Sequence, residues 1–279
     1  NQSASPRNIE ATSMFGDQMK RIVIALCLVV ATHSHAADRL NVLVLVSDDQ
    51  RYDTIHALGN ERIHTPNLDR LVKEGTTFTR AYCMGSTQPA VCVPSRAMFL
   101  SGRSLFHVPA NLADTPTLPE IFGKAGYSTF GTGKWHNGPA SYSRSFQDGE
   151  TIFFGGMSDQ FKVNVQPFDP KGKYPKTNVK AGEKHASSLF VDSAERFLKK
   201  HKSDKPFFCY VAFTSPHDPR TWVRPAVAAG IGTVAAGGLA VLQARRRRGR
   251  RRTGDADPVE FAAGAVRTIA DEVERRLRG

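Results

Sequence analysis

Two uninterrupted apolar runs are the strongest signals in the pattern of apolar and polar positions along this chain. Segments 40–46 (LNVLVLV) and 205–213 (KPFFCYVAF) are rich in β-branched, aliphatic and aromatic residues. Continuous apolar runs of this length are typical of strands that are buried on both faces of a parallel sheet. Segment 127–132 (YSTFGT) predicts a third strand. We therefore expect a sheet with these segments at its centre.

Helical patterns lie between the predicted strands. Segment 65–75 carries helix punctuation, because Thr65 can cap the helix, Pro66 suits its first turn and Gly75 can end it. Further helices are expected at 94–102, 117–126 and 183–202. The last of them has an apolar side made of Leu189, Phe190, Ala194, Phe197 and Leu198. Strands that alternate with helices predict an α/β fold, with a mostly parallel sheet flanked by helices.

The stretch from residue 137 to residue 180 lacks either pattern. It is dense in glycine, proline, serine and aromatic residues. Clusters of these residue types are typical of turns and loops. We therefore expect an irregular excursion there.

Each predicted strand is followed by polar residues that can carry chemistry: Asp48 and Asp49, then Lys134 and His136, then His217. Ligands of open α/β sheets bind at the carboxyl ends of the strands, so these side chains are expected to share one site. Adjacent carboxylates suit Ca²⁺ or Mg²⁺, a lysine is a fixed cation, and a histidine carries protons. Taken singly, each cluster also has a structural interpretation, as a turn cap, a structural pair or a surface residue.

Charge divides the chain into two parts. The formal net charge is +12, but residues 223–279 hold twelve arginines and six acidic residues, with no lysine or histidine. This abrupt change predicts an unrelated Arg-rich tail at 223–279, so the overall charge does not indicate a nucleic-acid partner. The apolar run 225–242 precedes the arginine clusters and is a marginal transmembrane candidate. We favour an accidental gene junction over an anchor, and expect membrane contact only if this run is a true span.

The N-terminal pattern predicts export. Residues 19–36 combine a basic start, a short apolar core and small residues near the end, which is the layout of a signal peptide. Residues 1–18 are interpreted as a non-native leader. We therefore expect a periplasmic or secreted protein, membrane-anchored only if the tail spans. The mature part would hold three cysteines, Cys83, Cys92 and Cys209, and this odd number suggests that one thiol is spared or consumed.

The segment 90–103 (AVCVPSRAMFLSGR) carries the most specific motif. Cys92 is followed by Val, Pro94, Ser95 and Arg96. This pattern resembles the signature of the type I, formylglycine-dependent sulfatases, and the resemblance covers residues 40–222. It implies an alkaline-phosphatase-like fold in which residues 40–222 form a C-terminally truncated sulfatase N-terminal domain. It also implies that a formylglycine-generating enzyme converts Cys92 to an aldehyde.

The same resemblance implies a cation site and a set of catalytic residues. Asp48, Asp49 and the modified Cys92 would bind Ca²⁺, with Mg²⁺ less favoured. The implied catalytic residues are Cys92, Arg96, Lys134, His136 and His217. Arg96 would hold the aldehyde hydrate, and Lys134 would contact both the hydrate and the sulfate. His217 would act on the leaving-group side, and His136 would assist release of the sulfated intermediate.

The resemblance therefore predicts a sulfuric ester hydrolase that acts on a sulfated small molecule or carbohydrate, with carbohydrate favoured. Further metal ligands and a second lysine, which sulfatases carry after the matching part, have no counterpart here. We therefore predict that the chain is inactive as written. Two alternatives stay open: a phosphate or phosphonate ester hydrolase of the same superfamily, and a non-catalytic, membrane-tethered remnant that binds an anionic ligand.

Overall fold

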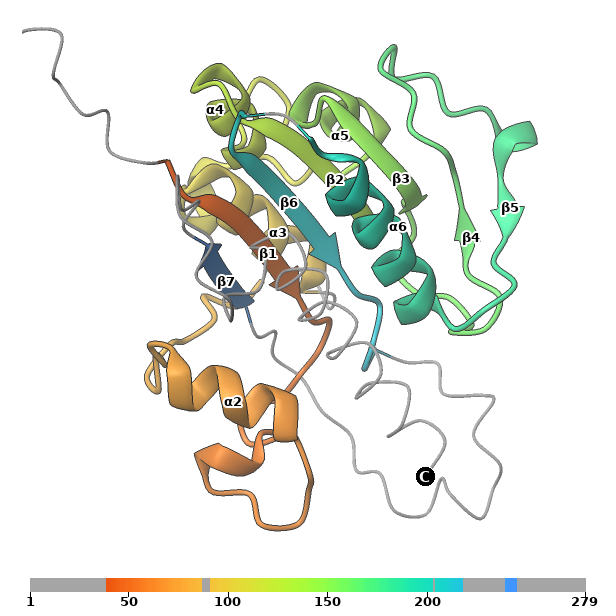
Figure 1. Ribbon diagram of the computed structural model, residues 1–279. Helices are drawn as coiled ribbons and strands as arrows, with labels where there is room; N and C mark the ends of the chain where they lie inside the picture. Colours follow the sequence, from red (N-terminus) through yellow and green to blue (C-terminus); the bar gives the residue numbers. More distant parts are fainter. Residues whose placement is uncertain (1–38, 87–90, 203, 218–238, 245–279) are drawn as a thin grey trace, which may run out of the picture. The chain divides into compact units, whose positions relative to one another are not determined.

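A five-stranded sheet organises the chain (Figure 1). The computed structural model describes residues 39–86, 91–202, 204–217 and, as backbone, 239–244. The sheet order is β3-β2-β6-β1-β7. Its strands are β1 (Asn41–Val46), β2 (Ser128–Lys134), β3 (Asp148–Phe153), β6 (Phe207–Ala212) and β7 (Leu239–Ala244). All pairings are parallel except that of β7, which runs antiparallel along β1. The predicted α/β fold with a mostly parallel sheet is confirmed.

Five α-helices and a two-stranded ribbon complete the described part of the chain. The helices are α2 (Pro66–Glu74), α3 (Cys92–Ser101), α4 (Leu118–Lys124), α5 (Pro139–Ser145) and α6 (Ala186–Lys200). Short 3-10 turns are η1 (His56–Leu58), η2 (Leu105–His107) and η3 (Lys176–Asn178). The ribbon pairs β4 (Asn164–Val165) with β5 (Lys180–Ala181).

The sheet is buried on both faces because its strands are apolar at successive positions. On one face, Leu43 and Leu45 of β1 pack with α6 residues such as Phe190. On the other face, Val42 and Val44 pack in a cluster with residues of α3 and α5. Successive side chains of a strand point to opposite faces, so an unbroken apolar run serves both clusters. The prediction that segment 40–46 forms a strand buried on both faces is therefore confirmed.

The predicted helices form, with one difference in capping. Gly75 ends α2 as expected, but the Thr65 side chain does not cap it. Instead, the Thr65 hydroxyl donates to the Asp69 carboxylate at 2.6 Å and accepts from the backbone N–H of His56 at 2.8 Å. It thus ties α2 to η1. In contrast, Thr117 forms a complete capping box with Glu120 at the start of α4.

The expected irregular excursion at 137–180 is wrong for its first half. α5 forms directly after Gly138, and β3 adds an edge strand to the sheet beside β2. Neither element has a regular apolar pattern. The sequence of α5, PASYSRS, has few apolar residues, and β3 is mostly polar until its last two residues. Tyr142 of α5 compensates by donating its hydroxyl to the buried carbonyl of Gly131 at 2.6 Å.

Several predictions about the chain ends lie outside the described residues: the leader 1–18, the signal peptide 19–36 and most of the tail 223–279. The end of the candidate span 225–242 is described, and there residues 239–242 belong to β7. Within the described part of the chain, no helix is both long and apolar enough to cross a membrane.

The central strands approach so closely at Gly133 that a side chain cannot be accommodated there. Gly133 has φ 89° in β2, and a Cβ added to it would lie 1.9 Å from the carbonyl oxygen of Ala212 in β6. We expect Gly133→Ala to lower the free energy of unfolding by about 3 kcal/mol or more, since it combines a backbone clash with left-handed strain. The measurement is the urea unfolding midpoint.

Gly59→Ala is the matched control, because Gly59 has φ 101° and no atom within 4 Å of an added Cβ. It isolates the strain alone, which costs about 1–2 kcal/mol. Equal losses in the two variants would show that the β2–β6 contact relaxes without penalty.

Candidate active site

The site forms around Asp48, the first acidic residue after β1. Asp48 is buried at 4% exposure, and its backbone N–H donates to the carbonyl of Ser215 at 3.1 Å. That bond joins the carboxyl end of β1 to the loop that follows β6. Asp49 comes next with φ 58°, a left-handed conformation that aspartate tolerates better than most residues. The two neighbouring carboxylates have different partners, Lys134 and Arg96 for Asp48 and His217 for Asp49.

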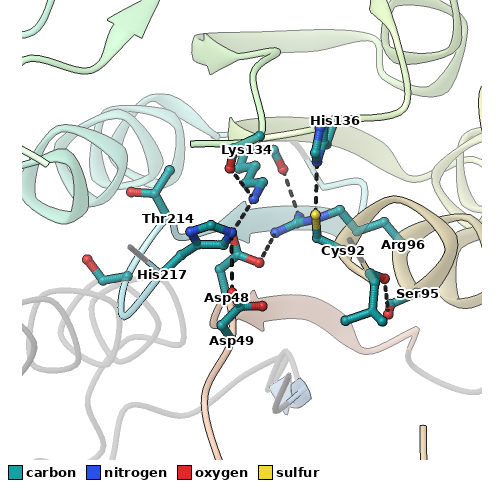
Figure 2. A network of polar contacts seen from close by, with 12 residues as sticks. Asp48, Asp49, Cys92, Ser95, Arg96, Lys134, His136, Thr214 and His217 are labelled. Carbon is teal, nitrogen blue, oxygen red and sulfur yellow. Dashed lines mark hydrogen bonds and ion pairs between the residues drawn. The ribbon is translucent and has the colours of Figure 1, made fainter. Parts of the chain in front are cut away.

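Two cationic side chains meet the Asp48 carboxylate. Lys134, at the end of β2, contacts it through Nζ and also donates to the carbonyl of Gly156 at 2.6 Å. Arg96, from α3, lies 3.6 Å from the second carboxylate oxygen. Figure 2 shows Asp48 between these two cations. Since Lys134 is fully buried, the three charges compensate one another away from water.

Arg96 also holds the surrounding elements together. Its Nη1 donates to the carbonyl of Lys134 at 2.8 Å and to the hydroxyl of Tyr210 at 3.2 Å. Burial lowers the pKa of Arg96, but the interactions with Tyr210 and Asp48 outweigh it and raise the pKa overall. Arg96 therefore stays charged while it links α3 to β2 and β6.

Cys92 faces His136 in the same cluster (Figure 2). Cys92 lies buried in the first turn of α3, and its Sγ is 3.1 Å from Nδ1 of His136. Burial, followed by the charges of Lys134 and Arg96, lowers the pKa of His136 to about 4. The imidazole is therefore neutral at neutral pH, so a ring nitrogen can accept a proton.

His217, in the loop that follows β6, is the last member of the site. Its Nε2 lies 3.2 Å from the Asp49 carboxylate, and Figure 2 shows this pair beside Asp48. Gln160 secures the loop that carries His217: its amide donates to the carbonyl of His217 at 3.1 Å, and its carbonyl accepts from the hydroxyl of Thr214 at 2.7 Å. The loop is thus held in place by a residue far away in the sequence.

The structure brings the residues predicted from the sequence together in one cluster: Asp48, Asp49, Cys92, Arg96, Lys134, His136 and His217. Their partners Tyr210, Gly156 and Gln160 were not predicted. Tyr210 could have been suspected from the sequence, because a tyrosine hydroxyl inside a fully buried strand needs a hydrogen-bond partner. The sequence gives no indication of Gly156 or Gln160. Gly156 acts through its backbone carbonyl, and Gln160 contacts a loop that is distant in the sequence.

Two residues of the cluster could serve as ligands of a divalent cation. The Asp48 and Asp49 carboxylates are hard oxygen donors, which suit Ca²⁺. Ca²⁺ takes six to eight oxygen ligands, whereas the described residues contain no cluster of three or more His, Cys, Asp or Glu suited to a metal ion. Lys134 and Arg96 already balance the charge of Asp48. Asp48 and Asp49 thus supply two carboxylates of the kind that such a site requires.

The described residues contain no disulfide. Cys83 is exposed, whereas Cys92 and Cys209 are buried and free. Burial raises the pKa of the Cys209 thiol far above its ordinary value. Cys209 is therefore an inert core residue, and Cys92 is the buried thiol that has polar neighbours.

Comparisons with known proteins identify the family of this chain. The sulfatase family model matches residues 40–230. Human N-acetylgalactosamine-6-sulfatase is 30% identical over 211 residues, which is 64% of this chain and 40% of that protein. An arylsulfatase from Klebsiella aerogenes is 28% identical, covering 72% of this chain and 48% of the relative.

A solved structure, described as a complex with its substrate D-glucosamine-2-N,6-O-disulfate, is 25% identical with a TM-score of 0.53. It covers 64% of this chain, and this chain covers 35% of it. The chain thus spans less than half the length of these relatives. Because the family model matches well over half of the sequence, the chain belongs to the sulfatase family, within the alkaline-phosphatase-like superfamily.

Proposed function

We propose that this site serves the hydrolysis of a sulfate monoester, with Cys92 converted to formylglycine by a formylglycine-generating enzyme. The observation that carries the proposal is the 3.1 Å contact between Cys92 Sγ and the neutral His136, next to the Asp48 ion cluster. Membership of the sulfatase family supports it. When present, a formylglycine hydrate would supply the nucleophile, and a divalent cation held by Asp48 and Asp49 would neutralise charge on the sulfuryl oxygens.

The protein's own side chains would provide charge and proton transfer. Lys134 and Arg96 place two positive charges at Asp48, within the cluster that also contains Cys92, and these cations would favour a bound sulfate. His136 Nδ1 faces the reactive position and, being neutral, can take a proton there. His217 lies at the outer, Asp49 side of the cluster and can donate a proton to the departing alcohol.

A sulfated carbohydrate is the favoured substrate class. The human relative is named as a sulfatase of N-acetylgalactosamine, and the solved relative holds a disulfated amino sugar as its substrate. A phosphate or phosphonate ester is the second candidate, because an oxyanion of similar shape suits the same cations. The family and the predicted signal peptide support an exported location.

Labelling position 92 with an aldehyde-specific hydrazide probe tests the nucleophile. After co-expression with a formylglycine-generating enzyme, we expect the peptide 81–96 to carry the probe at residue 92. Before labelling, the mass of this peptide should be lower by the difference between the CH2SH side chain of cysteine and the CHO side chain of formylglycine. Cys92→Ala is the negative control, and Cys209→Ala should leave labelling unchanged because Cys209 is in the core. An intact thiol at position 92 after co-expression would contradict the proposal.

Release of sulfate from an aryl sulfate with added Ca²⁺ tests turnover. Because the described residues contain no group of three or more His, Cys, Asp or Glu suited to a metal ion, we expect no release above that of Cys92→Ala. Release that depends on Cys92 would overturn the predicted inactivity, and a parallel assay with the matching aryl phosphate would then decide between the two substrate classes.

The depressed pKa of His136 predicts a pH-dependent loss of stability. The ring titrates at about 4 in the folded chain and at 6.5 in the unfolded chain. Between these values the unfolded state binds more protons, so the stability falls as the pH falls through this window. Allowing for the partial exposure of the ring, we expect a contribution of about 1–2 kcal/mol between pH 7 and pH 4.

Urea unfolding of His136→Asn at both pH values measures this contribution. Asparagine suits the site because His136 has φ 63° and asparagine tolerates the left-handed region. The variant should lose less stability on acidification than the parent chain, while His56→Asn, at an exposed histidine, should behave like the parent. An identical pH dependence in all three proteins would contradict the shifted pKa.

A further inference from the structure

Gly156, in the bend that follows β3, lies against two members of the cluster. Parallel pairing of β2 with β3 sets Lys134 opposite Phe153, so the segments that follow the two strands leave the sheet at the same edge. The carbonyl of Gly156 accepts from Lys134 Nζ at 2.6 Å. A Cβ added to Gly156 would lie 2.7 Å from Cε1 and 2.9 Å from Nε2 of His136. One glycine therefore adjoins both the buried ammonium group and the imidazole of the site.

The His136 ring is enclosed by Cys92 and Gly156. Its Nδ1 faces Cys92 Sγ at 3.1 Å (Figure 2), and its Cε1–Nε2 edge faces Gly156. Real Cβ atoms essentially never approach another heavy atom within 3.0 Å, so a side chain at position 156 and the ring in its present place exclude each other. Gly156 does not have a left-handed φ, so its backbone conformation does not require glycine. The need for glycine at this position comes from the ring.

The backbone on both sides of His136 is fixed. The N–H of Trp135 donates to the carbonyl of Phe153 at 2.9 Å. On the other side, the buried amide of Asn137 donates to the carbonyl of Val93 in α3 at 3.0 Å. The loop therefore cannot withdraw without breaking these bonds. A methyl group at position 156 would be accommodated by rotation of the imidazole away from Cys92.

We propose that Gly156 is a positioning residue: the lack of a side chain lets the His136 ring reach position 92, and the carbonyl holds Lys134 beside Asp48. This role rests on the proposed function, because it concerns the proton acceptor of that reaction. A proton acceptor must lie within hydrogen-bond reach of the group that it serves. A misplacement of about 1 Å can lower a rate about a hundredfold. Gly156 thus sets a distance on which the proposed chemistry depends.

NMR spectroscopy of the full chain with isotope-labelled histidine and cysteine tests the proposal. The contact predicts a nuclear Overhauser cross-peak between the ring proton on Cε1 of His136 and the Cβ protons of Cys92. The variants His136→Asn and Cys92→Ala assign this cross-peak, since each removes one of its two partners. Gly156→Ala should lose the cross-peak, because the added methyl group takes the place of the ring. A cross-peak that is unchanged in Gly156→Ala would overturn the proposal.

Gly155→Ala is the matched control. A Cβ added to Gly155 would lie 2.6 Å from ring atoms of Phe153, which belongs to the core of the sheet. Gly155, like Gly156, has no left-handed φ. The two neighbouring glycines thus receive the same methyl group against an aromatic ring, and the Gly155 variant should keep the cross-peak. Its loss in both variants would show a general disturbance of the bend after β3 and would overturn the proposal.

The double variant His136→Gly/Gly156→Ala decides the outcome if Gly156→Ala fails to fold. Glycine suits position 136 because the φ there is 63°. The double variant should unfold at the same urea concentration as His136→Gly, since the overlap disappears with the ring. A lower midpoint would show that the methyl group meets something other than the ring, and would overturn the proposal.

Hydrazide labelling of the parent chain separates this proposal from the proposed function. An unlabelled Cys92 after co-expression contradicts the proposed function, whatever the NMR result. A cross-peak retained in Gly156→Ala contradicts only the role of Gly156.

Discussion

The ion cluster of Asp48 with Lys134 and Arg96 is the constraint on which the site depends. Its members come from the ends of β1 and β2 and from α3, and all three are buried. Removing one partner from such a cluster leaves an uncompensated charge, which typically costs about 3–5 kcal/mol. The cluster can therefore form only when the two strands and the helix are in register. Cys92 and His136, neighbours of Arg96 and Lys134 in sequence, are brought together by the same requirement.

The sequence predicted which side chains lie together better than it predicted the elements around them. Asp48, Lys134, His136 and His217 follow strands with clear apolar runs, and parallel strands bring their carboxyl ends to one edge, so topology alone made these residues neighbours. α5 and β3 were missed because their stability comes from tertiary contacts, such as the Tyr142 hydroxyl on Gly131, and not from local apolar spacing. Gln160 and Thr65 act through side-chain bonds to distant segments, which no local pattern records.

The edge of the sheet next to β1 shows how little a compositional boundary says about folding. The switch to an arginine-rich composition predicted that residues after 222 are unrelated to the preceding domain, yet β7 pairs along the whole of β1. Pairing in a sheet uses backbone groups, which every residue except proline offers in full. An exposed strand edge accepts such a neighbour with little regard to its ancestry. A change in composition therefore does not decide where the sheet ends.

Burial sets the electrostatics of the charged cluster around Asp48. The Asp48 cluster is shielded from solvent ions, so salt changes its internal energies little, and it can hold a neutral His136 next to Cys92 under most conditions.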